Sequence, residues 1–284
     1  RINIGGTYII RVRLLYLQNT NHTMNELRHQ QVTRFIMPLR EGGSLPALAE
    51  ADDGFKYVVK LRGAGHGAKA LIAELIGGEI ARAAGLRMPE LVFLDIDEDF
   101  GRTEPDEEIQ DLLKASRGLN LGMHFLSGAV TLDPYINSID ALDASKIVWL
   151  DSFITNVDRT VRNTNMLLWH NEPWLIDHGA SLMFHHSWHG WQKSAQSPFP
   201  YIKDHALLHQ ASMIPEAETQ MLKTITPELI ADIIAMIPGE WLTGQDSDIS
   251  QDEARHVYRT FLTDRLKASP IFTKQAIDAR NAII

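Results

Sequence analysis

The chain has 284 residues, of which 44% are hydrophobic and 22% charged, so it can bury a sizeable core. Its formal charge is -9 and it has no run of Lys or Arg, so no nucleic-acid partner is expected. It has no cysteine, which excludes disulfides and Cys-based zinc sites, and no apolar stretch approaches the roughly 20 residues of a membrane span. The composition favours a cytoplasmic protein.

The first half of the chain is predicted to be rich in strands. Residues 1–24 differ in character from the rest and are interpreted as an N-terminal extension, which is followed by a β-rich lobe over residues 25–126. The pattern predicts one helix over 68–84, stopped by Gly85, and a solvated acidic loop over 95–108. The predicted strands span 32–39, 55–61, 91–96 and 118–126.

The second half, residues 127–284, is predicted to be a mainly helical lobe. Apolar residues at helical spacing predict a helix over 142–155. A hairpin follows, with strands over 166–169 and 174–177, and the chain from residue 201 onward has helical periodicity. The sequence therefore predicts an α+β fold with a β-rich N-lobe and an α-helical C-lobe.

The region around Asp158 holds the residue types that phosphoryl transfer requires. Asn163 lies five residues after Asp158, and Asp177 lies nineteen residues after it, at the end of the predicted hairpin. The reaction needs a carboxylate that orients the attacking hydroxyl, and an amide and a second carboxylate that hold Mg²⁺. The order D-x-x-x-x-N and then D-x-G is typical of kinases, although each half alone also occurs in ordinary turns.

Lys60 is the candidate for binding nucleotide phosphates. Strand alternation places it on the same face as Val58, where a buried lysine needs an anionic partner. The alternative is a strand-end lysine that extends to water. Two glutamates of the following helix, Glu74 and Glu79, can serve as its partner. Glu74 is favoured because its neighbours on the helix are small and allow close approach of another element: Ala70, Gly77, Gly78 and Ala81.

Gly42, Gly43 and Ser44 lie where a turn over the nucleotide phosphates is expected. Glycine allows backbone N–H groups to approach a phosphate closely. Such a tripeptide also occurs in ordinary hairpins, so both interpretations stay open.

Taken together, these stretches resemble the HipA-like kinase family, a bacterial relative of the phosphatidylinositol-kinase-like fold. The resemblance runs from about Val32 to near the C-terminus and is most specific between Asp158 and Gly179. The stretches that carry it are Gly42-Gly43-Ser44, Tyr57-Val58-Val59-Lys60, Ala73-Glu74 through Gly85-Leu86, Gly118-Leu119-Asn120-Leu121-Gly122, Asn156-Val157-Asp158-Arg159 and Trp174-Leu175-Ile176-Asp177-His178-Gly179.

The resemblance implies a two-lobed kinase that uses ATP and Mg²⁺. By this likeness Asp158 is the catalytic base or hydroxyl-orienting acid, and Asn163 and Asp177 are the metal ligands. Lys60 holds the nucleotide phosphates with Glu74 as its partner.

The acceptor of the phosphate is not identified by these motifs. The resemblance implies a Ser or Thr of a protein, and the alternatives are a small-molecule or lipid kinase, or a non-catalytic nucleotide-binding module. Two positions depart from the pattern of related enzymes. Thr160 stands where relatives often carry His, and His178 stands where protein kinases carry Phe.

A cluster of His185, His186 and His189 follows the Asp177-His178-Gly179 motif. These side chains either shape an acceptor site or pack on the lobe. A zinc site is disfavoured because no Asp or Glu lies within the cluster.

Overall fold

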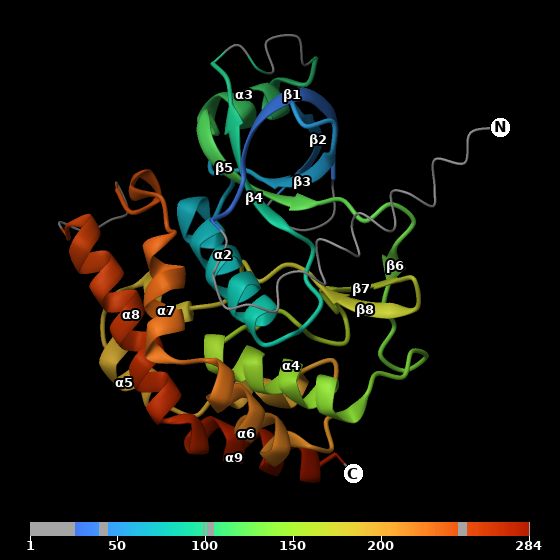
Figure 1. Cartoon of the computed structure of the whole chain (residues 1–284), viewed down its shortest axis with the longest axis vertical. Coiled ribbons are helices and arrows are strands. Elements are labelled where there is room, and N and C mark those ends of the chain that lie inside the picture. The colour runs from blue at the N-terminus through green and yellow to red at the C-terminus, as the bar shows by residue number, and fades with distance from the viewer. Residues whose placement is uncertain (1–25, 40–44, 99, 101–104, 244–248, 284) are drawn as a thin grey trace.

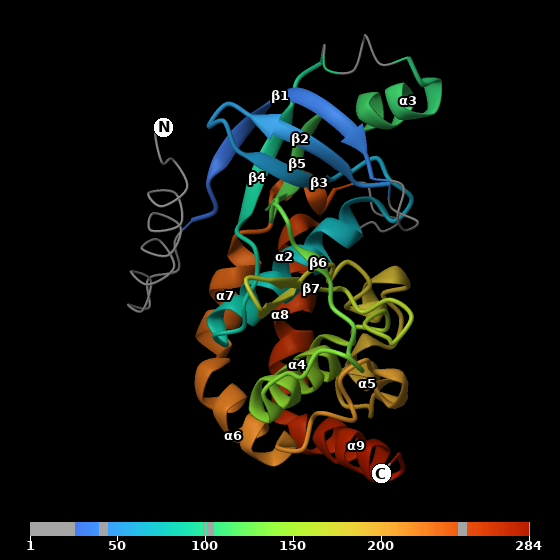
Figure 2. The ribbon, with the colours of Figure 1, turned by 90° about the vertical axis from the view of Figure 1, so that its right-hand side faces the viewer.

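The computed structural model describes residues 26–39, 45–98, 100, 105–243 and 249–283. A five-stranded β-barrel lies at one end of the molecule and a group of helices at the other (Figures 1 and 2). Helix α2 (Gly67–Ala83) lies between them. The α+β fold with strands first and helices second is therefore confirmed.

The barrel is closed, with the spatial order β1-β2-β3-β5-β4. Its strands are β1 (His29–Pro38), β2 (Ala47–Ala51), β3 (Lys56–Lys60), β4 (Leu91–Ile96) and β5 (Gly118–His124). Only β1 and β4 pair in parallel, and the other neighbours are antiparallel. Four strands match the predicted ones. The fifth, β2, was missed because its alanines have a weak preference for strands.

Strand β3 alternates between the barrel interior and the outside, as the sequence predicts. Tyr57 and Val59 are 0% and 1% exposed and belong to the core inside the barrel. Val58 lies on the outer face and packs against the core that contains α2. Lys60 shares this outer face, and its side chain therefore points away from the barrel interior.

The acidic stretch after β4 was predicted to be a loop as far as residue 108, and this is wrong at its end. Helix α3 (Glu107–Ala115) begins there, with the Asp106 side chain accepting hydrogen bonds from the backbone N–H groups of Glu108 and Ile109. An aspartate cap followed by two glutamates in the first turn favours a helix start. Ile109 and Leu113 then pack onto the barrel core.

Helix α2 is buried along eleven consecutive residues, from Leu71 to Ala81. Its apolar side chains belong to the same core as those of the helices in the second half, including α4 (Ala141–Ile154). The helix ends at Ala83, and Gly85 follows its C-cap with a φ of 78° that suits glycine. Because this core runs from α2 into the helical part, the lobe boundary after residue 126 stays a prediction.

The helices of the second half surround α4, which is almost entirely buried. They are α5 (Trp191–Ala195), α6 (Ile214–Thr224), α7 (Pro227–Ala235), α8 (Gln251–Lys267) and α9 (Ser269–Asn281), with 3-10 turns η1 (Met183–His186), η2 (Pro200–Asp204) and η3 (Gly239–Trp241). Helices α6 and α9 lie farthest from the barrel (Figures 1 and 2). None of the helices in the described ranges is long and apolar enough to cross a membrane.

A small sheet of β6 (Val130–Thr131), β7 (Met166–Trp169) and β8 (Glu172–Leu175) joins the two parts. The predicted β7 is confirmed, but β8 starts and ends two residues earlier than predicted. The reason is a tighter turn, because His170 and Asn171 both adopt positive φ, as a two-residue hairpin turn requires.

Candidate active site

Lys60 lies between two carboxylates that come from distant parts of the chain. Its Nζ is 2.7 Å from Oδ1 of Asp177 and 3.9 Å from Oε2 of Glu74. The lysine ends β3, the aspartate follows β8 and the glutamate belongs to α2. The fold therefore brings together three residues that the sequence singled out.

The charges of this cluster support one another. Burial lowers the pKa of Lys60, but the carboxylates of Glu74, Asp177 and Asp158 outweigh it, so the pKa is raised. Burial likewise raises the pKa of Asp177, but the adjacent Lys60 ammonium outweighs it and the pKa is lowered. Both side chains are thus charged at neutral pH. The negative charge of Asp158 is the smallest of the contributions that raise the pKa of Lys60.

Asp158 is held in place by amide groups. Its Oδ2 accepts hydrogen bonds from Nδ2 of Asn163 at 2.7 Å and from Nδ2 of Asn165 at 3.0 Å. Its backbone N–H donates to Oδ1 of Asn156. The predicted pair of Asp158 and Asn163 is therefore in contact. Asn165 was missed, because a second asparagine two residues on gave no spacing signal of its own.

Glu74, rather than Glu79, is the glutamate beside Lys60. Its Oε2 also accepts the backbone N–H of His178 at 2.8 Å, so it holds the Asp177-His178-Gly179 segment. Glu79 instead pairs with Arg82, at 3.2 Å. The preference for Glu74 over its rival thus agrees with the geometry.

The small residues around Glu74 allow this close approach. A Cβ at Gly77 would lie 2.7 Å from the Cβ of His178, so any larger residue forces the helix and the segment apart. About two turns earlier in the helix, the Cβ of Ala70 would lie 3.7 Å from a Cβ at Gly179, an ordinary contact. Helix α2 therefore packs directly against the Asp177-His178-Gly179 segment.

A buried polar network beneath Asp158 was not predicted. The carboxylate of Asp151 accepts hydrogen bonds from Nδ2 of Asn156 at 3.0 Å, Nε of Arg159 at 2.6 Å and Nε2 of His205 at 2.9 Å. Burial raises the pKa of Asp151, but Arg159 and His205 outweigh this and the pKa is lowered. The only local signal is an aspartate near the end of a strongly apolar helix.

Arg159 extends this network to the segment after β8. It donates to the backbone carbonyl of Ile176 at 3.3 Å, to that of Asn165, and its Nη2 lies 3.1 Å from Nε2 of His178. The guanidinium has no other proton state at neutral pH, so Nε2 of His178 accepts the bond. The loop around Asp158 and the segment around Asp177 are thereby locked together.

The predicted phosphate-covering turn, Gly42-Gly43-Ser44, lies outside the described residues. Within the described ranges, no group of three or more His, Asp or Glu residues is arranged to hold a metal ion. The histidines after Gly179 therefore give no support to a zinc site. Asn163 offers an amide oxygen and Asp177 a carboxylate, the kinds of ligand that suit an ion that keeps several waters.

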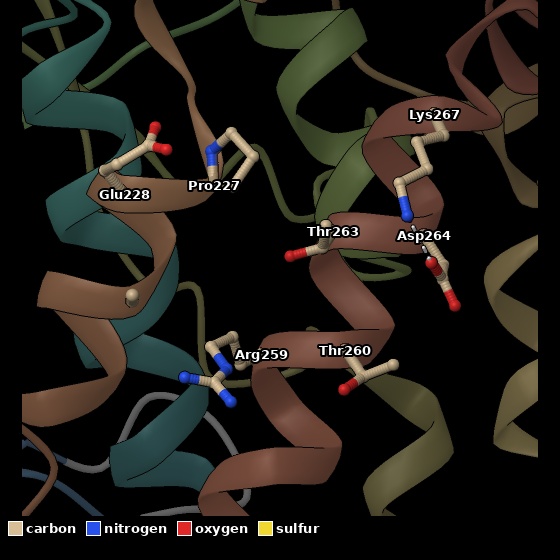
Figure 3. A pocket seen from close by; sticks show the side chains of 8 residues that line it. Pro227, Glu228, Arg259, Thr260, Thr263, Asp264 and Lys267 are labelled. Atoms are coloured by element: carbon tan, nitrogen blue, oxygen red, sulfur yellow. Dashed lines mark hydrogen bonds and ion pairs between the residues drawn. The ribbon is translucent and has the colours of Figure 1, made fainter.

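A surface groove of about 420 Å³ lies elsewhere, between α7 and α8 (Figure 3). Residues of both signs line it, including Glu228, Arg259 and Lys267. None of the residues around Lys60 or Asp158 contributes to it, so it is separate from the candidate active site.

One solved structure shows that the overall fold is that of a kinase. The chain is similar to the Helicobacter pylori proinflammatory kinase CtkA, with a TM-score of 0.54 and 12% identity over 90% of this chain and 98% of that one. It also resembles a Golgi casein kinase solved with Mn/ADP bound, with 13% identity over 95% of this chain and 76% of that one. The TM-score of 0.46 makes this second likeness too weak to support an inference.

A comparison with models of protein families shows to which family of kinases the chain belongs. The model of the HipA-like kinase matches residues 32–269. Because this match covers most of the sequence, the chain belongs to the HipA-like kinase family, as the sequence motifs indicate. No curated protein matches the chain.

Proposed function

We propose that this chain transfers the γ-phosphate of ATP to a hydroxyl group, with a Ser or Thr side chain of a protein as the acceptor. The observation that carries the proposal is the position of Lys60, whose ammonium contacts Asp177, lies 3.9 Å from Glu74 and is stabilised by the charge of Asp158. A charged lysine held by a helix glutamate beside two further carboxylates suits the binding of nucleotide phosphates.

Asp158 is proposed to orient and deprotonate the attacking hydroxyl. Two amide groups fix its Oδ2, so the carboxylate is held in one orientation. Its other oxygen accepts no hydrogen bond from any residue in the described ranges. That oxygen can therefore take a hydrogen bond from the acceptor hydroxyl.

Asn163 and Asp177 are proposed to hold Mg²⁺, which would neutralise charge on the phosphates when bound. The amide nitrogen of Asn163 donates to Asp158, which leaves its amide oxygen for a cation. Oδ1 of Asp177 contacts Lys60, so metal binding has to share or replace this ion pair. Glu74 stays beside Lys60 in either case, and its negative charge keeps the ammonium in place.

The nucleotide cradle is completed in this proposal by Gly42, Gly43 and Ser44, whose backbone N–H groups would cover the phosphates. The nucleotide would then lie between a lobe of residues 25–126 and a lobe of residues 127–284. The contact between α2 and the Asp177-His178-Gly179 segment joins these two parts beside the proposed catalytic residues.

The proposal is tested by incubation with γ-labelled ATP and Mg²⁺, using protein, lipid and metabolite acceptors in separate reactions. Wild type is expected to label a protein on Ser or Thr, and the Asp158→Ala variant is the blank. If only a metabolite or a lipid is labelled, the acceptor is a small molecule and not a protein. Full labelling by Asp158→Ala would remove Asp158 from the chemistry altogether.

A further inference from the structure

Four basic side chains gather beside the candidate active site, and the proposed phosphotransfer does not use them. They are His66 and Lys69 at the start of α2, and His185 and His186 in η1, and we refer to them as the basic cluster. The ring centres of His66 and His186 are 5.9 Å apart, and those of His185 and His186 are 4.6 Å apart.

The side chains of this cluster disfavour positive charge on one another. Burial lowers the pKa of His186, and the positive charge of Lys69 and the ring of His66 lower it further. Burial lowers the pKa of His185 well below its ordinary value, and His186 and Lys69 add to the effect. An anion bound at this position would relieve all of these repulsions at once.

No carboxylate among the described residues pairs with the basic cluster to balance its positive charge. Within the described part of the chain, neither Lys69 nor His66 nor His186 forms an ion pair with a carboxylate. The first turn of α2 contains no acidic residue, and the His66 side chain does not cap it. The N-terminus of a helix of 17 residues, with its positive dipole end, therefore adds to the same field.

One buried nitrogen of the cluster lacks a partner. His185 is fully buried, and its Nδ1 lies 3.0 Å from the hydroxyl of Tyr258. Burial raises the pKa of Tyr258, so its hydroxyl keeps a proton that it can donate to Nδ1. The other nitrogen, Nε2, has no hydrogen-bond partner among the described residues, and it carries the hydrogen when Nδ1 accepts from Tyr258. In that tautomer Nε2 is a buried donor, which favours an acceptor nearby.

The cluster adjoins the catalytic segment. Ala70, the residue after Lys69, is the one whose Cβ lies 3.7 Å from the position of a Cβ at Gly179. The first turn of α2 thus packs on the segment that carries Asp177, while η1 follows that segment in the chain. An anion at the cluster would bridge α2 and the chain after Gly179.

We propose that the basic cluster binds a phosphate monoester. The histidine rings lie close together, Lys69 acts on their charge, and all of these side chains can donate hydrogen bonds, which suits a dianion with several acceptor oxygens. The monoester has two possible sources. One is an acceptor that is already phosphorylated. The other is a phosphoserine of this chain, such as exposed Ser187 next to His186, and this source rests on the proposed phosphotransfer.

The test is a titration of phosphatase-treated protein with inorganic phosphate and with phosphoserine, in the absence of ATP. The Cε1–H NMR resonances of the histidines report the binding, and His186→Gln assigns one of them. We expect a saturable shift of the His66 and His186 resonances. Lys69→Met should raise the Kd at least about tenfold, as expected for the loss of one charge-assisted contact. Lys193→Met, at an exposed lysine in the segment after Gly179, should leave the Kd unchanged.

Equal shifts with sulfate, serine or chloride at matched ionic strength would overturn the proposal, as would an unchanged Kd in Lys69→Met. Mass spectrometry after incubation with ATP distinguishes the sources. Phosphate found on Ser187, and absent in Ser187→Ala, would show that the monoester comes from this chain. Phosphoserine binding with no phosphate on Ser187 would show that it comes from a phosphorylated acceptor. The Asp158→Ala variant should bind phosphate like wild type. Phosphate binding at the basic cluster and the proposed phosphotransfer are therefore tested separately, and either can be refuted without the other.

Discussion

Neutralising Glu74 separates its electrostatic role from its structural one. In Glu74→Gln the amide oxygen can still accept the N–H of His178, so the packing of the segment is kept. What is lost is a negative charge 3.9 Å from Nζ of Lys60, worth about 4 kcal/mol at an effective dielectric constant of roughly 20. Glu74 is only 1% exposed, so the variant also avoids the cost of burying a carboxylate charge, and this offsets part of the lost interaction energy.

The remaining loss is about 2 kcal/mol, which corresponds to about 30-fold in kcat/KM for Mg-ATP. Steady-state kinetics measure it, and thermal unfolding checks that the variant is folded. Glu79→Gln is the matched control, since it lies on the same helix but pairs with Arg82, and we expect less than about a threefold effect. An equal loss in both variants, or none in Glu74→Gln, would refute the reasoning.

Two further predictions concern stability. Gly77→Ala places a Cβ 2.7 Å from that of His178 and should destabilise the protein by about 1–3 kcal/mol. The control Gly65→Ala has open space around its Cβ and should change the unfolding midpoint little. Equal unfolding midpoints in the two variants would contradict the packing argument. Burial lowers the pKa of both His185 and His205, so below about pH 6.5 the unfolded chain binds protons that the folded chain does not. The free energy of unfolding should therefore fall by about 2 kcal/mol between pH 7.5 and 5.5. An unfolding midpoint that stays constant over this range would contradict the lowered pKa of these histidines.

The parts of the site that could be predicted are those with a local signal. Lys60 was placed by strand alternation, and Glu74 by the small residues on its helical face. The order of Asp158, Asn163 and Asp177 reflects a loop and a hairpin, which bring nearby residues together. Each of these signals lies within about twenty residues of the position it identifies, in one stretch of the chain.

The parts that could not be predicted depend on distant partners. His205 lies 54 residues from Asp151, and nothing around either residue indicates that they meet. The strand Ala47–Ala51 is formed by its position in a small barrel rather than by its alanines. The helix Glu107–Ala115 was hidden by its acidic start, although Asp106 is a usual capping residue.

The measurement that tests the central proposal most directly is ATP binding by calorimetry, with and without Mg²⁺, on wild type, Asp158→Ala and Asp177→Ala. Wild type should bind ATP more tightly with Mg²⁺, and Asp158→Ala should keep this dependence while losing phosphotransfer. Asp177→Ala should lose the dependence on Mg²⁺. Mg²⁺-dependent binding that is intact in Asp177→Ala would contradict the assignment of Asp177 as a metal ligand.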